Sequence, residues 1–425
     1  MKYPRLITVI LLLCSIGFLS FHVYRDERER RMMKEDLIEL SKIKYGLFSV
    51  DEWKLILAGI VTKKLDEFKL EDASKEEMRR KVSELLNKLV SDFEVRYREK
   101  KSQQLLGFIE GGLVSMMGAF EQIKEDIPEL TEQILDFMND PENKATLRRY
   151  LITKYVDRTS ASIDYSMHDY IISHYDFMDR ADAICGLNEK LDSLDHERRP
   201  YTISLLVLAA LAMLYTLFIK GLSKTEYLIL TLVSLFLLLT GLLLPMIELD
   251  ARISAMSFTL FGEPVNFQDQ VLYYRSKSIL EVVRLLLTQG SFDLLAVGVL
   301  IFTFSVLFPL SKLIATMLYF YFPHRRSNRL IQFTVFKTGK WSMADVMVIA
   351  IFMAFIGFSG IITEQLTQVE NITPNIDILT TNMSCLRIGF FAFTAFAVLS
   401  LLIAHRLQYE MKNGLNGERI NKVVP

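Results

Sequence analysis

Six apolar runs, each about 20 residues long, constrain the fold of this chain more than any other feature of its sequence. A helix needs about 20 apolar residues to cross roughly 30 Å of hydrocarbon, where every backbone polar group must be paired within the protein. The runs cover residues 6–24, 201–219, 227–247, 294–322, 342–362 and 388–404. The sequence therefore predicts an all-α polytopic membrane protein with six transmembrane helices, one at the N-terminus and five clustered after residue 200.

The first run is predicted to remain in the protein as a transmembrane anchor over residues 1–24. The alternative is a cleaved signal peptide. The run is long for the apolar region of a signal peptide, and no small-x-small cleavage site follows it. An uncleaved anchor is therefore favoured.

The distribution of basic residues between the loops predicts the orientation of the spans. The loop after the fourth run carries basic residues and no acidic ones, namely Arg325, Arg326, Arg329, Lys337 and Lys340. The loop over 364–385 carries only acidic charges, namely Glu364, Glu370 and Asp377. Both termini are therefore predicted to be cytoplasmic. Arg28, Arg30 and Arg31 oppose this topology, although three neighbouring acidic residues offset their charge.

This topology places residues 25–199 outside the cytoplasm as a separate domain. Apolar residues recur there at three- and four-residue spacing, which is typical of amphipathic helices. The pattern predicts helices over 35–45, 50–68, 75–99, 105–123, 128–138 and 143–174. A segment of this length can bury its own core, so we expect a periplasmic helical-bundle domain.

The apolar segment over 105–120 permits two interpretations. Gly107 and Gly111 have the four-residue spacing that lets helices approach closely, so the segment is a candidate for contact with the bilayer or with a lipid chain. Glu110 interrupts it, and it is short for a span. A buried helix of the bundle is therefore the favoured interpretation.

The rest of the chain divides into a membrane module over 200–405 and a cytoplasmic tail over 406–425. Within the module, residues 246–267 alternate in polarity and predict a short β element outside the cytoplasm. Residues 278–288 follow as an amphipathic helix, with Ile279, Val282, Val283 and Leu286 on one face.

Charge and motifs exclude several classes of function. The formal net charge is −1, from 49 basic and 50 acidic residues, so the sequence predicts no nucleic-acid partner. No catalytic, metal or cofactor motif is recognisable, and we expect neither an enzyme nor a cofactor. Asp164 and His168 have the four-residue spacing of a metal-binding pair, but a charged, solvent-facing helix end is the favoured interpretation. Cys185 and Cys385 lie on the same predicted side of the membrane, where they are either paired or free.

The fourth run contains an ionisable residue, Lys312, at a depth where charge is costly and therefore a sign of function. Pro309 lies one turn earlier, has no amide proton, and frees the carbonyl group of Ser305, so a kink is expected there. In one interpretation Lys312 extends its ammonium group to the cytoplasmic headgroups. In the other it faces a polar crevice that the kink opens, with Ser305 and Ser311 among the nearby hydroxyls.

The fifth run opens with Trp341, Ser342 and Asp345. Trp341 suits a membrane interface, Ser342 can cap the helix, and Asp345 complements the helix dipole. Asp345 is also a candidate counter-ion for Lys312.

Three groups of residues make the second half of the chain resemble the paraquat-inducible protein A family. They are Leu244-Pro245 at the end of the third run, Ser305-x-x-x-Pro309-x-x-Lys312 in the fourth, and Trp341-Ser342-Met343-x-Asp345-Val346 at the start of the fifth. The resemblance extends over residues 222–405, nearly half of the chain. In this family the residue that matches Lys312 lies in a polar intramembrane network, which makes Ser311 and Asp345 candidates for the same network.

The resemblance implies residence in the bacterial inner membrane and a part in moving membrane lipids between the inner and outer membranes, beside MCE-domain proteins. The candidate lipid path or polar network comprises Ser305, Pro309, Ser311, Lys312, Trp341, Ser342 and Asp345. Well-known members carry two membrane modules and cysteine-rich zinc ribbons. This chain has one module and no C-x-x-C motif, so a homo-oligomer is one expected arrangement. The alternative hypothesis is a membrane-anchored sensor or scaffold without enzymatic activity.

Overall fold

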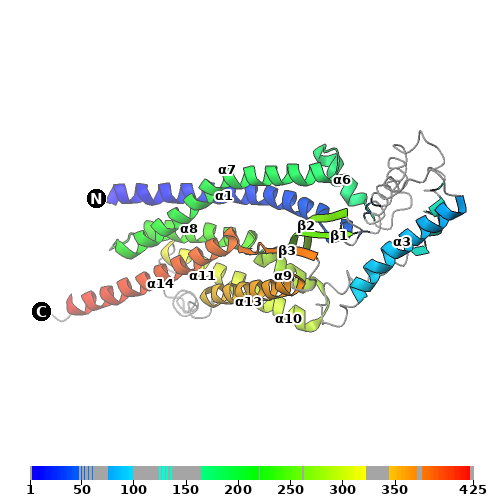
Figure 1. Ribbon diagram of the computed structural model, residues 1–425. Coiled ribbons are helices and arrows are strands. Elements are labelled where there is room, and N and C mark those ends of the chain that lie inside the picture. The colour runs from blue at the N-terminus through cyan, green and yellow to red at the C-terminus, as the bar shows by residue number, and fades with distance from the viewer. Residues whose placement is uncertain are drawn as a thin grey trace.

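The computed structural model describes residues 2–46, 75–98, 164–219, 221–260, 263–321, 344–370 and 376–421, with isolated positions between 49 and 60 and between 124 and 135. These residues form long helices and one small antiparallel sheet (Figure 1). The predicted helices over 105–123 and most of those over 50–68 and 128–138 lie outside the described residues, as does the apolar segment over 105–120.

Six helices of the described part are long and apolar enough to span a membrane, which confirms the six predicted runs. They lie in α1 (Lys2–Leu40), α7 (Arg180–Phe218), α8 (Lys224–Leu243), the continuous helix from α10 (Phe292–Phe302) through η3 (Thr303–Leu307) to α11 (Phe308–Tyr321), α13 (Ala344–Glu370) and α14 (Ile388–Asn421). The protein is thus built as a multi-pass membrane protein.

Two of these helices extend far beyond the predicted spans. α1 continues without a break from the anchor to Leu40, so the helix predicted over 35–45 is the end of α1 followed by the short η1 (Ile43–Tyr45). α7 begins at Arg180 and passes through Pro200 into the membrane. The two helices pack side by side along their length (Figure 1). We call this pair the α1/α7 hairpin.

Two shorter helices belong to the segment between α1 and α7. α3 (Lys75–Arg98) matches the helix predicted over 75–99. α6 (Ser166–Tyr175) begins later than the prediction over 143–174, because Asp164 and Tyr165 are not helical. The carboxylate of Asp164 instead accepts a hydrogen bond from the amide of Ser166 at 2.9 Å. α6 ends at Asp176, which adopts the left-handed conformation.

The sheet is larger than the predicted β element over 246–267. β1 (Ile247–Leu260) and β2 (Glu263–Lys277) form a long hairpin, and β3 (Ile376–Asn382) pairs with the other edge of β1, giving the order β2-β1-β3. The short β4 (Cys385–Leu386) also pairs with β1. β3 and β4 come from the loop between the fifth and sixth spans. We refer to the end of the bundle that carries the sheet as the sheet end.

The helices of the module begin where their sequences provide caps. Ser223 and Glu226 form a capping box at the start of α8, and Ser278 and Glu281 form another at the start of α9 (Ile279–Thr288). α9 confirms the amphipathic helix predicted over 278–288. It turns through Gly290, which has a φ of 72° and therefore favours glycine, into α10.

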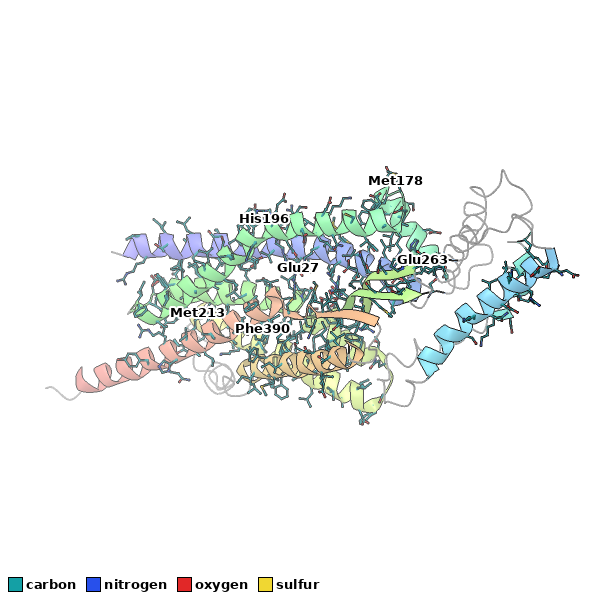
Figure 2. All side chains as sticks on the ribbon, in the orientation of Figure 1. Glu27, Met178, His196, Met213, Glu263 and Phe390 are labelled. Atoms are coloured by element: carbon teal, nitrogen blue, oxygen red, sulfur yellow. The ribbon has the colours of Figure 1, made fainter. Side chains whose placement is uncertain are left out.

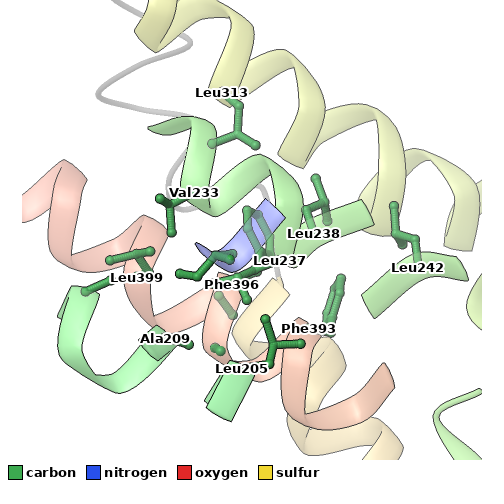
Figure 3. Close-up of a cluster of buried hydrophobic side chains, with 14 of the residues drawn as sticks. Leu205, Ala209, Val233, Leu237, Leu238, Leu242, Leu313, Phe393, Phe396 and Leu399 are labelled. Atoms are coloured by element: carbon green, nitrogen blue, oxygen red, sulfur yellow. The ribbon is translucent and has the colours of Figure 1, made fainter. Parts of the chain in front are cut away.

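The main core lies where α8 packs against α1, α11 and α14. Figure 3 shows Val233, Leu237 and Leu238 of α8 among Leu313 of α11 and Phe393, Phe396 and Leu399 of α14. α8 and α14 approach each other at two glycines. A Cβ added at Gly241 would lie 2.7 Å from the amide nitrogen of Phe393, and one added at Gly389 would lie 2.5 Å from the carbonyl oxygen of Pro245. The Leu244-Pro245 pair therefore marks a close backbone contact between these helices.

Candidate functional site

Lys312 is buried in the bundle rather than extended to the surface. Only 4% of the residue is exposed. Its ammonium group donates a hydrogen bond to the hydroxyl of Ser400 at 2.9 Å and lies 3.4 Å from the carbonyl oxygen of the same residue. The first interpretation from the sequence, in which the ammonium group reaches the headgroups, is therefore wrong. Ser400 lies on α14, and sequence reasoning missed it because a single serine in an apolar helix carries no signal of its own.

A small cavity adjoins the Lys312 ammonium group. It measures about 10 Å³ and lies between α8, α11 and α14, lined by Thr231, Lys312, Leu313, Thr316, Ser400, Ile403, Ala404 and Leu407. A space of this size holds about one water molecule. Thr231 and Thr316 donate their hydroxyl hydrogens to backbone carbonyls one turn earlier, so both oxygens retain accepting capacity. The site can thus hold a hydrated ammonium group, and it is too small for an acyl chain.

The helix that carries Lys312 is irregular about two turns earlier. Residues Thr303–Leu307 form a π turn, in which the amide of Phe308 donates to the carbonyl of Thr303. Pro309 follows and is buried. A π turn is a feature that is frequent at functional sites. The kink expected at Pro309 stays a prediction. Ser305 lies inside this turn, is fully buried, and its hydroxyl has no hydrogen-bond partner among the described residues.

The remaining predicted residues do not gather around Lys312 in the described part. Ser311 is exposed, and its hydroxyl donates to the carbonyl of Phe308 on its own helix. Trp341 and Ser342 lie outside the described residues. Asp345 belongs to the first turn of α13, and its side chain is not among those described, so its role as a counter-ion stays a prediction.

A second polar cluster, which sequence reasoning missed, joins the α1/α7 hairpin to the sheet. Arg30 of α1 donates to both carboxylate oxygens of Glu248 in β1, at 3.1 and 3.4 Å, and to Asp195 of α7 at 3.0 Å. Glu27, which is 1% exposed, pairs with Arg198 of α7 and with Arg387. Figure 2 shows Glu27 on the side of α1 that faces the module. We call these six residues the charged cluster.

Contacts with residues distant in sequence explain two of the three arginines that follow the first span. Arg30 lies in the cluster, and Arg31 donates to Glu281 of α9 at 2.5 Å, so both are held by partners distant in sequence. Burial by itself would raise the pKa of Glu248, but the positive charges of Arg30 and Arg387 outweigh it and lower the pKa below its ordinary value. Only one feature of the sequence pointed to these contacts, namely that the positions of the arginines disagreed with the predicted topology.

Two further candidates from the sequence are placed by the structure. His168 is buried between the rings of Tyr45 and Tyr165 and contacts Asp169, so the favoured prediction of a solvent-facing helix end is wrong for this residue. Asp164 lies before the helix, so the alternative, a metal-binding pair of the two residues, is not formed either. Among the described residues, no group of three or more metal-binding side chains comes together. All three cysteines are described and free, so Cys185 and Cys385 are not paired.

Comparison with known proteins supports the resemblance seen in the sequence. No curated protein and no solved structure matches the chain. The model of the family described as paraquat-inducible protein A matches residues 269–367, a narrower range than the resemblance over 222–405. This range runs from β2 to α13 and includes Ser305, Pro309 and Lys312, whereas Leu244-Pro245 and Ser400 lie outside it. Residues 269–367 of this membrane protein are thus similar to the paraquat-inducible protein A family.

Proposed function

We propose that the protein is an inner-membrane component of a lipid-trafficking system between the inner and outer membranes, acting with an MCE-type partner. In the proposed orientation both termini are cytoplasmic. The sheet end and residues 25–199 face the periplasm. The observation that carries the proposal is the ammonium group of Lys312, which is buried within the family-matched helix and bound to Ser400 of another span. A buried charge at membrane depth is costly and is a sign of function.

The position of Lys312 supports a role in opening the module rather than direct contact with an acyl chain. Its ammonium group connects α11 to α14, and the adjoining cavity holds about one water molecule. The π turn lies two turns from this contact, and the buried hydroxyl of Ser305 lacks a partner among the described residues. A helix with such an irregularity can change its packing at lower cost than a regular one. The proposed working step is a separation of α11 from α14 that breaks the Lys312–Ser400 contact.

Substitution of Lys312 tests this proposal. Lys312→Met keeps the length of the side chain and removes its charge, so α11 stays packed while the contact with Ser400 is lost. We expect lipid transfer and the outer-membrane barrier to fall at least several-fold, at an unchanged level of protein in the membrane. Ser311→Ala is the matched control, because this neighbouring hydroxyl is exposed and bonds only within its own helix. Normal barrier function in Lys312→Met at normal abundance would overturn the proposal.

A sensor or scaffold is the second candidate, and one observation favours it. α1 and α7 run without a break from the sheet end through the membrane, so a displacement outside can reach the cytoplasmic side. Mass spectrometry of lipids and proteins that are retained by the detergent-purified protein separates the two candidates. Enrichment of lipids and of an MCE-domain protein supports trafficking, whereas enrichment of a kinase or regulator without lipids supports the sensor.

A further inference from the structure

The fourth span changes its register partway along its length. Residues Thr303–Leu307 form a π turn, in which the amide of Phe308 donates to the carbonyl of Thr303, five residues earlier. In a regular α-helix this amide would donate to the carbonyl of Phe304, four residues earlier. The π turn thus accommodates one extra residue. Every later position is therefore displaced by one residue, or about 100° around the helix axis, from its place in a regular helix.

Pro309 gives a physical reason for the wide turn. A proline ring within a regular α-helix clashes with the carbonyl four residues earlier, which here belongs to Ser305, and a wider turn relieves the clash. Proline also has no amide hydrogen, so the carbonyl of Ser305 loses its usual donor. The carbonyl of Phe304 loses its own, because the Phe308 amide bonds to Thr303. Two adjacent carbonyls without their ordinary helical donors are costly in hydrocarbon.

The two halves of the span present different faces to their neighbours because of this displacement. In α10, Gly298 faces α9, since a Cβ added there would lie 3.0 Å from the Cβ of Leu286. Four turns of a regular α-helix hold about 14 residues, so positions 298 and 312 of such a helix would share one face. After the π turn, Lys312 contacts Ser400 of α14 and adjoins Thr231 of α8. The π turn therefore sets the direction in which the ammonium group points.

Removal of the extra residue would exchange the side chains at the Lys312 site. In a regular helix continued from α10, position 311 would take the place that Lys312 now holds, and Lys312 would take the place of Leu313. Leu313 is 4% exposed and belongs to the main core, on the side of α11 that faces α8 (Figure 3). A serine hydroxyl would then meet Ser400, and the ammonium group would enter an apolar core. The Lys312–Ser400 contact thus depends on the π turn.

We propose that the π turn aims Lys312 at Ser400, and that Pro309 is the positioning residue that holds the π turn. This inference rests on the proposed function, in which the Lys312–Ser400 contact opens, and it names the residue that sets the contact. Pro309 acts through the backbone of its own helix. The buried hydroxyl of Ser305, which has no partner among the described residues, belongs to the same turn. Costly features of this kind cluster at functional sites.

Three variants of the full-length protein test the proposal. Pro309→Ala restores the amide donor and removes the ring, so the span can become a regular helix. Deletion of Phe304 from the Pro309→Ala protein takes one residue out of the turn, which returns the regular helix to the original register. Insertion of one alanine after Phe304 in the Pro309→Ala protein is the matched control, because it shifts the register by the same amount in the wrong direction.

Oxygen accessibility of a nitroxide spin label, in bilayers of phosphatidylethanolamine and phosphatidylglycerol, reads the register directly. The three native cysteines, all free, are first replaced by serine, and the label is attached to a cysteine at position 311, 313 or 314. In the natural sequence Ser311 is exposed, Ile314 is 54% exposed and Leu313 is buried, so accessibility is high at 311 and 314 and low at 313.

Pro309→Ala is expected to change this pattern in a defined way. Position 313 moves to the exposed place of Ile314, so its accessibility rises roughly threefold, whereas accessibility falls by a similar factor at 311 and 314. Deletion of Phe304 restores the original pattern, and insertion of alanine does not. An unchanged pattern in Pro309→Ala would overturn the proposal. Should Pro309→Ala fail to accumulate, the deletion variant decides alone: the original pattern supports the proposal, and a failure to fold overturns it.

The outer-membrane barrier separates the register from the proposed function. We expect barrier function to fall several-fold in Pro309→Ala, to recover in the deletion variant and to stay low in the insertion variant. A changed accessibility pattern combined with a normal barrier would leave Pro309 as the positioning residue and reject the proposed function. An unchanged pattern combined with a damaged barrier in Lys312→Met would do the reverse.

Discussion

Arg30 of α1 forms two hydrogen bonds with Glu248 of β1, across 218 positions of the sequence. Neither side chain is more than 7% exposed, so the pair is buried where the α1/α7 hairpin meets the sheet. Lys34 and Asp250 repeat the connection one turn farther along α1, at 3.5 Å. The α1/α7 hairpin and the sheet are therefore packed against each other through buried charged side chains.

Removal of one partner of this pair is predicted to destabilise the protein strongly. Arg30→Met removes a positive charge that compensates the buried carboxylates of Glu248 and Glu27. Removal of one partner of a buried ion pair lowers the free energy of unfolding by about 3–5 kcal/mol. We expect a lower midpoint of thermal unfolding in detergent and reduced abundance in the membrane. Arg28→Met is the control, because Arg28 is exposed on the same helix and its loss should cost less than about 0.5 kcal/mol. Equal stability of the two variants would contradict the role given to the charged cluster.

The same contact makes the stability of the protein depend on pH. The pKa of Glu248 is lower in the folded protein than its ordinary value of 4.5, because Arg30 and Arg387 outweigh the effect of burial. A lowered carboxyl pKa contributes stability that is complete above the ordinary pKa and is lost as the pH falls through the folded value. Thermal unfolding should therefore vary little from pH 7 to pH 5.5 and shift to lower temperature below about pH 4.5. Glu248→Gln should flatten the acidic part of this profile, and an unchanged profile would contradict the assignment.

The spans could be predicted from the sequence because hydrocarbon imposes a simple rule on composition and length. The β element and the helix over 278–288 could also be predicted in outline, since alternation and capping residues are local signals. The continuity of α1 beyond Tyr24 could not, because the charged stretch from Arg25 to Arg31 resembles a domain boundary. Within it, Glu27 and Arg30 are instead buried and contact partners that lie 165 to 360 positions away.

The candidate site could be predicted only in part, because its contacts also join residues that lie far apart in the sequence. Lys312 was recognisable because a lysine within an apolar run is costly. Ser400 was not, because serine is common in membrane helices and gains meaning only from the side chain opposite it. The contact between α13 and β3 could not be predicted either. The apolar residues of α13 satisfy the rule for a span, and only the hydrogen bonds of Asn382 in the structure show that Ser359 and Thr363 lie beside β3.

Loss of the Ser400 hydroxyl is predicted to weaken the contact between α11 and α14. Ser400→Ala removes the acceptor at 2.9 Å and leaves the ammonium group of Lys312 with the carbonyl oxygen at 3.4 Å. Hydrogen bonds between membrane helices contribute about 0.6 kcal/mol on average and up to about 1.7 kcal/mol, so we expect a cost in this range. A double-mutant cycle with Lys312→Met measures it. Additive effects of the two substitutions would show that the contact contributes nothing.

Glycine substitutions on α14 and α13 are predicted to have opposite outcomes. Gly389→Ala would place a Cβ 2.5 Å from the carbonyl oxygen of Pro245, whose backbone cannot move without separating α8 from α14. Gly360→Ala on α13 meets no atom within 4 Å and is expected to be neutral or slightly stabilising, since alanine favours helix by about 1 kcal/mol over glycine. Thermal unfolding and the yield of folded protein in detergent measure both. α13 and α14 are both apolar spans. If every glycine in a membrane helix were sensitive to substitution, both variants would therefore unfold at a lower temperature and give less folded protein. A loss confined to Gly389→Ala would instead show that α8 and α14 form the fixed centre of the bundle, against which α13 is only peripherally packed.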